Sequence, residues 1–417
     1  MNQTAKGEIL TTDGIPLKVS LRRSERINKF RAFALVLPLT LFIIITFVIP
    51  IIAMLTRSID DKQINTVFPK TFEIYKQWDR KKLPTEEMYA TIFGEIVNAE
   101  KRAIGKASTR MNYSRSGWKS LIKKSKRKFK KIKEGPYKEQ MIAVDKRWGK
   151  IEFWKALGEM VDPYTFGYFL NAVDLKYDSN KEIIRQPEKR RIYNYTWYKT
   201  VKISVLVTLF CLILGYPIAH LLATLPLKYS NLLMIFVLLP FWTSLLVRTV
   251  SWIIILMKKG VFNSILVWAG VIADENRMQL IYNETGTLIA MTQILLPFMV
   301  LPLYSVMKTI PPSYMRAALN LGAQPMHAFY RVYMPQTVPG ISAGGLLVFV
   351  LAIGYFITPE LVGGADGQLI GHWIAYHLKS TLNWGLCAAL GTILLVVMLT
   401  LYWVYNKIVG IENIKLG

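Results

Sequence analysis

The sequence predicts an all-α, polytopic membrane protein with six transmembrane helices. Three observations support this fold class. Apolar residues make up 52% of the chain and are gathered into runs of about 20, the length at which a helix crosses a bilayer. The net charge of +25 suits a membrane protein that holds Lys and Arg against an anionic membrane face. Both cysteines, Cys211 and Cys387, lie within apolar runs, so a disulfide framework is not expected.

The chain begins with a polar segment, residues 1–31, and an apolar run, residues 32–55. The apolar run is longer than that of a signal peptide and lacks a small-residue cleavage site, so it is predicted to be the first transmembrane helix. Basic residues gather just before it, and they place residues 1–31 in the cytoplasm as a tail. These residues are Lys18, Arg22, Arg23, Arg26, Lys29 and Arg31.

Residues 56–199 contain no apolar run long enough to span a membrane. Residues 57–198 carry 32 Lys plus Arg against 18 Asp plus Glu. Long loops are largely exempt from the positive-inside rule, and the number of later spans places this segment outside. We expect a basic periplasmic insertion, with helical patterns around Glu86–Arg102, Trp118–Lys133 and Met141–Met160. A surface for anionic lipid or a soluble partner protein is an alternative, whereas nucleic-acid binding is not expected outside the cell.

Residues 200–409 are predicted to hold the other five transmembrane helices, with residues 410–417 as a cytoplasmic tail. The chain is therefore expected to be a multi-pass protein of the bacterial inner membrane, with both termini in the cytoplasm. The five apolar runs are Val201–Ala223, Leu232–Met257 with a kink at Pro240, approximately Thr287–Met307, Ser342–Leu361, and Leu386–Val409.

The segment between the fourth and fifth spans, residues 308–341, is too polar to cross a membrane and too regular for a slack loop. Its prolines and its glycine predict two short helices joined by Gly322 in the left-handed conformation. Pro311 and Pro312 end the preceding helix, and Ser313 is the expected N-cap of a first short helix that runs through Leu321. Pro325 is expected to begin the second short helix, and Pro335 and Pro339 to end it. On the predicted topology this segment faces the cytoplasm.

This segment resembles the cytoplasmic loop of permease subunits of binding-protein-dependent ABC importers of type I. That loop has the form E-A-A, three residues, G, nine residues, I, one residue, L-P. The matching positions here are Ala317, Ala318, Gly322, Val332 and Pro335. Arg316 stands where the family has glutamate, and Ala323 follows the glycine. The resemblance implies that these seven residues couple the membrane helices to an ATPase.

Within that family, the stretches Leu238–Ile253, Ile294–Met307 and Phe356–Ile374 resemble the spermidine/putrescine-type permeases most. The resemblance implies a MetI-like fold, a second and related permease subunit, a dimer of ATP-binding subunits and a periplasmic solute-binding protein, besides membrane lipid. No G-x-x-x-x-G-K-[ST] motif occurs in the sequence, so the chain is not expected to be an enzyme. ATP and Mg are expected only on the partner ATPase, and no cofactor is expected in this chain.

Three residues are candidates for the translocation path of a small polar, polyamine-like solute. Arg248 lies within an apolar run, where a charge is costly and usually faces a cavity or a partner. Glu360, with Tyr355 nearby, could attract a cation by charge and ring-face interaction. A structural role is the alternative for each. Two other classes of protein stay open: a secondary transporter or channel, and a membrane anchor for the basic insertion.

Overall fold

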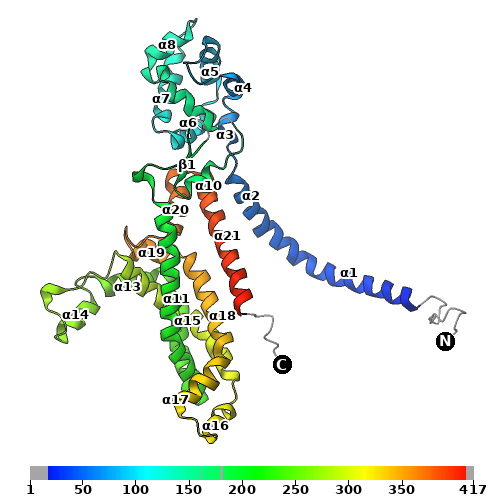
Figure 1. Cartoon of the computed structure of the whole chain (residues 1–417), viewed down its shortest axis with the longest axis vertical. Helices are drawn as coiled ribbons and strands as arrows, with labels where there is room; N and C mark the ends of the chain where they lie inside the picture. Colours follow the sequence, from blue (N-terminus) through cyan, green and yellow to red (C-terminus); the bar gives the residue numbers. More distant parts are fainter. Residues whose placement is uncertain (1–16, 161, 179–181, 410–417) are drawn as a thin grey trace, which may run out of the picture. The chain divides into compact units, whose positions relative to one another are not determined.

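The computed structural model describes residues 17–160, 162–178 and 182–409 (Figure 1). Most of the predicted N-terminal tail and the whole C-terminal tail, residues 1–16 and 410–417, lie outside these ranges. The chain forms two compact units, residues 1–57 and 58–417. Across the described residues, six helices are long and apolar enough to cross a membrane, which confirms the predicted fold class.

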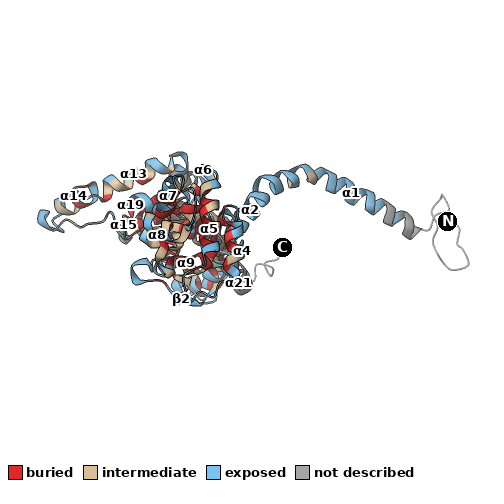
Figure 2. Cartoon of the chain, turned by 90° about the horizontal axis from the view of Figure 1, so that it is seen from above, coloured by how far each residue is buried: buried red, intermediate tan, exposed pale blue. Residues whose placement is uncertain are grey.

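The first unit is one helical rod. It consists of α1 (Leu17–Ile43), a π-helical turn (Ile44–Val48) and α2 (Ile49–Arg57). Its apolar side chains are exposed, as Figure 2 shows along α1, and this suits a lipid-facing span. The helix begins within the basic segment that the sequence assigned to the tail, because Lys and Arg are good helix formers.

Three long helices form the centre of the second unit: α11 (Tyr193–Thr224), α15 (Glu284–Thr309) and α18 (Met334–Ile353). They run alongside one another in Figure 1 and share one apolar core. Glycines allow the close approach of α15 and α18. A Cβ on Gly344 would lie 3.0 Å from the Met299 carbonyl oxygen, and one on Gly340 would lie 3.1 Å from the Leu303 Cα. The two glycines are four residues apart, the spacing of close helix pairs in membranes.

The predicted span Leu232–Met257 is broken in two. The helix α12 (Leu227–Leu238) passes into a 3₁₀ turn at Leu239–Trp242, and α13 (Leu245–Leu256) begins after Ser244. The prediction of a single kinked helix was wrong because Pro240 lacks an N–H and its ring obstructs the preceding turn. A short helix, α14 (Val261–Trp268), follows, and α13 and α14 are largely exposed or half-buried (Figure 2).

The predicted fifth span, Ser342–Leu361, also has different bounds. Its helix ends at Ile353, followed by Gly354, and α19 (Ile357–Val362) is separate. Next come α20 (Ile370–Tyr376), a π-helical turn (His377–Thr381) and α21 (Trp384–Val409). The last of these is the sixth span.

The insertion contains a helical domain with its own core. Large aromatic side chains dominate that core, including fully buried Trp118, Trp148 and Trp154. Of the predicted helical patterns, Trp118–Lys133 corresponds to one helix, whereas Glu86–Arg102 and Met141–Met160 are each divided between separate elements. The helices are α3 (Lys62–Asn65), α4 (Pro69–Gln77), α5 (Glu86–Asn98), α6 (Lys101–Ser114), α7 (Trp118–Phe129), α8 (Tyr137–Val144) and α9 (Ile151–Leu157), with 3₁₀ turns at Lys146–Gly149 and Gly158–Met160.

The chain enters and leaves this domain through paired backbone. Asp61 N donates to Pro163 O at 2.9 Å, and Thr165 N donates to Ile59 O at 2.8 Å. Beyond it lie α10 (Gly167–Asn171), an antiparallel pair of strands and a 3₁₀ turn at Glu188–Arg190. The strands are β1 (Leu175–Tyr177) and β2 (Ile183–Arg185).

An ion pair between Arg110 and the buried Asp61 lies where the domain meets the start of the last span. The Arg110 guanidinium bonds Asp61 through Nε and Nη2 at 2.7 and 2.5 Å and lies 4.9 Å from the centre of the Tyr168 ring. Tyr168 in turn packs closely against Gly385, at the start of α21. The Tyr113 hydroxyl donates to the Thr381 carbonyl just before α21.

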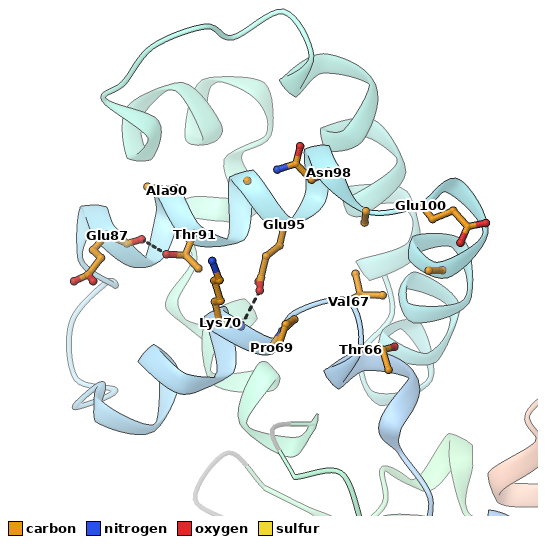
Figure 3. A pocket seen from close by; sticks show the side chains of 13 residues that line it. Thr66, Val67, Pro69, Lys70, Glu87, Ala90, Thr91, Glu95, Asn98 and Glu100 are labelled. Atoms are coloured by element: carbon orange, nitrogen blue, oxygen red, sulfur yellow. Dashed lines mark hydrogen bonds between the residues drawn. The ribbon is translucent and has the colours of Figure 1, made fainter.

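A pocket of about 730 Å³ lies between α4 and α5 (Figure 3). Three glutamates line it: Glu87, Glu95 and Glu100. Glu95 accepts from the Lys70 and Thr71 backbone N–H groups at 2.8 and 3.3 Å and from the Thr71 hydroxyl at 2.5 Å. These N–H groups belong to the first turn of α4 and have no partner within the helix. Glu95 therefore stabilises the start of α4.

Candidate functional site

The Lys308–Ile341 segment folds as a short helix followed by a turn. The helix α16 runs over Pro312–Asn320, with Pro311 as its N-cap and Pro312 in its first turn. The prediction of Ser313 as N-cap was wrong by two positions. Pro312 can occupy the first turn because the N–H that it lacks would be unpaired there.

Gly322 ends α16 in the left-handed conformation, with φ +87°, as predicted. Its N–H donates to Leu319 O at 3.0 Å, and Ala323 N–H donates to Ala318 O at 3.1 Å. These two bonds define a Schellman motif. The spacing between the second alanine and the glycine is therefore a requirement of the turn.

Beyond the turn, the second helix does not stop at Pro335 or Pro339. It begins with α17 (Pro325–Ala328), passes through a π-helical turn (Phe329–Tyr333) and continues into α18. Pro325 opens it, as predicted. The π turn widens the helix directly before Pro335, and such bulges accommodate a proline that would otherwise end a helix. We call α16, α17 and the π turn the handle. The handle is therefore continuous with the fifth span.

Aromatic contacts join the handle to the second span. The His220 ring on α11 lies 5.5 Å from the Phe329 ring and 5.0 Å from the Tyr333 ring, centre to centre. The Tyr216 hydroxyl lies 3.2 Å from the Thr337 hydroxyl. A displacement of the π turn would therefore act on both α11 and α18.

The predicted coupling residues differ in exposure. Arg316, Ala317, Gly322 and Pro335 are exposed, Ala323 and Val332 are half-buried, and Ala318 is buried. The structure also shows exposed apolar side chains on this segment that the sequence argument missed. Among them are Leu321, Met326 and Tyr330, of which Leu321 is 89% and Met326 66% exposed. The sequence signal that could have indicated them is the presence of large apolar residues beside a glycine turn, in a segment that does not span the membrane.

The candidate path residues gather where α13 meets α19. The Thr249 hydroxyl lies 3.2 Å from the Thr358 hydroxyl, and Arg248 is close enough to Tyr355 to interact electrostatically. The Arg248 Nε is buried and has no hydrogen-bond partner among the described residues. Glu360 instead pairs with the Nδ1 of His372 on α20. The His372 pairing was not predicted, because the two residues meet only through the packing of α19 and α20.

Comparisons with known proteins find a family and similar sequences for the C-terminal half of the chain. Residues 203–409 match the family described as binding-protein-dependent transport system inner membrane component. The spermidine/putrescine transport system permease protein PotB of Escherichia coli (strain K12) is 39% identical over 220 residues, covering 51% of this chain and 79% of that protein. PotB of Haemophilus influenzae (strain ATCC 51907 / DSM 11121 / KW20 / Rd) is 35% identical over 222 residues, covering 52% and 77%.

Among solved structures, a bacterial ABC transporter involved in the import of the acidic polysaccharide alginate aligns with 18% identity and a TM-score of 0.44. The alignment covers 55% of this chain and 81% of that one. The family match begins after the insertion and includes both the coupling segment and the α13–α19 contact.

Proposed function

This chain belongs to the family of binding-protein-dependent transport system inner membrane components, and we propose that it lines the path by which an ABC importer moves a polyamine-like solute into the cell. It is a multi-pass inner membrane permease subunit of the polyamine type, and it is not an enzyme. In the proposal, a solute-binding protein delivers the solute and a related permease subunit completes the path. ATP and Mg bind to a separate ATPase dimer.

The observation that carries the proposal is the handle formed by α16, α17 and the π turn. A Schellman turn closes it, it continues into α18, and it presents Leu321 and Met326 to solvent. Exposed apolar side chains on a rigid element mark a contact surface for another protein. The handle lies in the cytoplasm in this proposal, with both termini, and the insertion lies outside.

The position of Arg316 bears on the partner's charge. Its side chain is exposed at the site where the family carries a carboxylate. We therefore expect the facing ATPase surface to carry a carboxylate in place of a cation, since like charges at a contact cost several kcal/mol.

Reconstitution in proteoliposomes with the cognate ATPase, second permease and binding protein tests the proposal. Uptake of radiolabelled spermidine and putrescine is expected to require ATP, and the L321D/M326D variant is expected to lose both uptake and ATPase co-purification. Leu227→Asp is the control, because Leu227 is 64% exposed at the start of α12 and lies outside the handle. Uptake without ATP or ATPase would support the secondary-transporter alternative.

A further inference from the structure

A groove of about 650 Å³ lies between α6 and α7 in the insertion. Five cationic side chains line it, and no carboxylate does so among the described residues. The cations are Lys101, Lys123, Lys126, Arg127 and Lys130, and the remaining lining residues are Ile104, Gly105, Ser108 and Ile122. The insertion domain therefore carries a concentrated positive charge above a small apolar floor.

These five cations differ from others nearby because none forms an ion pair within the part of the chain that the structure describes. On another face of α7, Lys124 pairs with Asp145 at 2.9 Å, and Arg147 pairs with the same carboxylate at 2.9 Å. Hydrogen bonds from Arg147, and also from Lys124, hold the pKa of Asp145 well below its usual range. The fold thus neutralises Lys124 internally and leaves the groove without a counter-charge.

The crowding has a measurable electrostatic consequence at one groove residue. Lys126 is half-buried, and its ammonium donates to the Ala99 carbonyl. Burial, and then the charge of Lys130, lower the pKa of Lys126. A bound anion would offset the effect of the Lys130 charge, since an opposite charge favours the protonated amine.

The position of the groove argues against a bilayer as its ligand. The C-terminal half of α6 faces the start of the sixth span: the Tyr113 hydroxyl donates to the Thr381 carbonyl. Arg110 lies over the ring of Tyr168, which packs against Gly385. The groove uses the N-terminal half of α6, from Lys101 to Ser108. At a rise of 1.5 Å per residue, Lys101 lies about 13 Å along the helix from Arg110. The groove is therefore at the end of the α6–α7 hairpin opposite to Tyr113 and its contact before the sixth span.

We propose that this groove binds an acidic segment of a soluble protein partner. Lys123, Arg127 and Lys130 recur once per helical turn, about 5–6 Å apart. Carboxylates on alternate residues of an extended chain have a similar spacing, about 6.6 Å. Ile104 and Ile122 provide an apolar floor against which the methylene groups of those glutamate side chains can pack. A single small anion would fill only a fraction of the groove.

Binding of a fluorescein-labelled peptide with alternating glutamates to the full-length protein in nanodiscs tests this proposal. The triple variant Lys123→Gln, Arg127→Gln and Lys130→Gln is expected to weaken binding at least tenfold. Lys119, Lys128 and Lys131 are exposed and lie outside the groove. Their triple substitution by Gln removes the same charge from the same region and is expected to change affinity less than twofold.

Three results would overturn the proposal. The wild-type protein could fail to bind the peptide, or the two triple variants could weaken binding equally, which would indicate only diffuse charge attraction. Inorganic phosphate or phosphatidylglycerol vesicles could also displace the peptide at equal charge concentration, which would assign the groove to small anions or to lipid. The assay needs neither ATPase nor solute, so its failure would leave the proposed permease function untouched.

Discussion

Gly322 determines the geometry of the coupling handle. It has φ +87°, and no atom lies within 4 Å of the position that a Cβ would take. A larger side chain would therefore act through backbone strain, about 1–2 kcal/mol for a residue forced into the left-handed region, and not through a clash. We expect Gly322→Val to abolish ATP-driven spermidine uptake in proteoliposomes while the protein still inserts and purifies normally.

Gly322→Asn provides the control for this prediction, because Asn adopts the left-handed conformation more readily than other non-glycine residues. It should retain most of the uptake. Normal uptake by the Val variant, or equal loss in the Asn variant, would show that the left-handed turn does not govern coupling.

Two residues of the turn were predicted correctly, whereas the N-cap of α16 and the long-range pairs were not. Gly322 and Pro325 were assigned correctly, because backbone conformation at a turn depends on the residue itself and its neighbours. The partner of Glu360 could not be inferred, since His372 is on a different helix. For the same reason, the sequence could not show that Arg248 lies beside Tyr355.

The contact between α15 and α18 depends on small residues in α18. A Cβ on Gly344 would lie 2.9 Å from the Met299 Sδ and 3.0 Å from its carbonyl oxygen, whereas one on the adjacent Gly345 would meet only the Thr208 Cγ2 at 3.9 Å. We expect Gly344→Ala to lower the thermal unfolding midpoint in detergent, because overpacking costs about 1–3 kcal/mol.

Gly345→Ala should leave the midpoint unchanged or raise it, because alanine favours helix by up to about 1 kcal/mol over glycine. The opposite signs expected for neighbouring positions make the comparison decisive. Equal midpoints for the two variants would mean that α15 and α18 do not approach as closely as the structure shows.

Apolar run length predicted the spans apart from the third, for which the structure has Leu245–Trp268 in place of Leu232–Met257. Prolines misled the prediction of where helices end. Pro240 was assigned a kink and instead breaks the helix, whereas Pro335 was assigned a helix end and instead lies within a continuous one. The difference is the preceding backbone. A π turn precedes Pro335, and whether such a turn forms depends on packing, here of Phe329 and Tyr333 against His220.

The core of the insertion and its attachment could not be predicted from the sequence, because both depend on residues far apart in the chain. Its sequence predicted a basic insertion with helical patterns, but not the core that its aromatic residues form. That core joins residues from Ile64 to Met160, and such long-range packing leaves no periodic signal. Its attachment through Arg110, Asp61 and Tyr168 likewise depends on residues far apart in the chain.

The excision of the insertion separates the transporter from the membrane-anchor alternative. Asp60 and Tyr164 are bridged partners in antiparallel backbone, so a short Asn-Gly turn can replace residues 61–163 without stretching the chain. This excision removes the domain core together with Asp61 and Arg110, and it leaves no buried ion without its partner.

The family match at 203–409 excludes the excised part. We therefore expect the shortened chain to insert and to retain spermidine uptake within about threefold of the wild type. Such a change corresponds to less than the 1.4 kcal/mol of a tenfold loss. Complete loss of uptake from a correctly inserted, ATPase-bound protein would instead show that the basic insertion is required for transport.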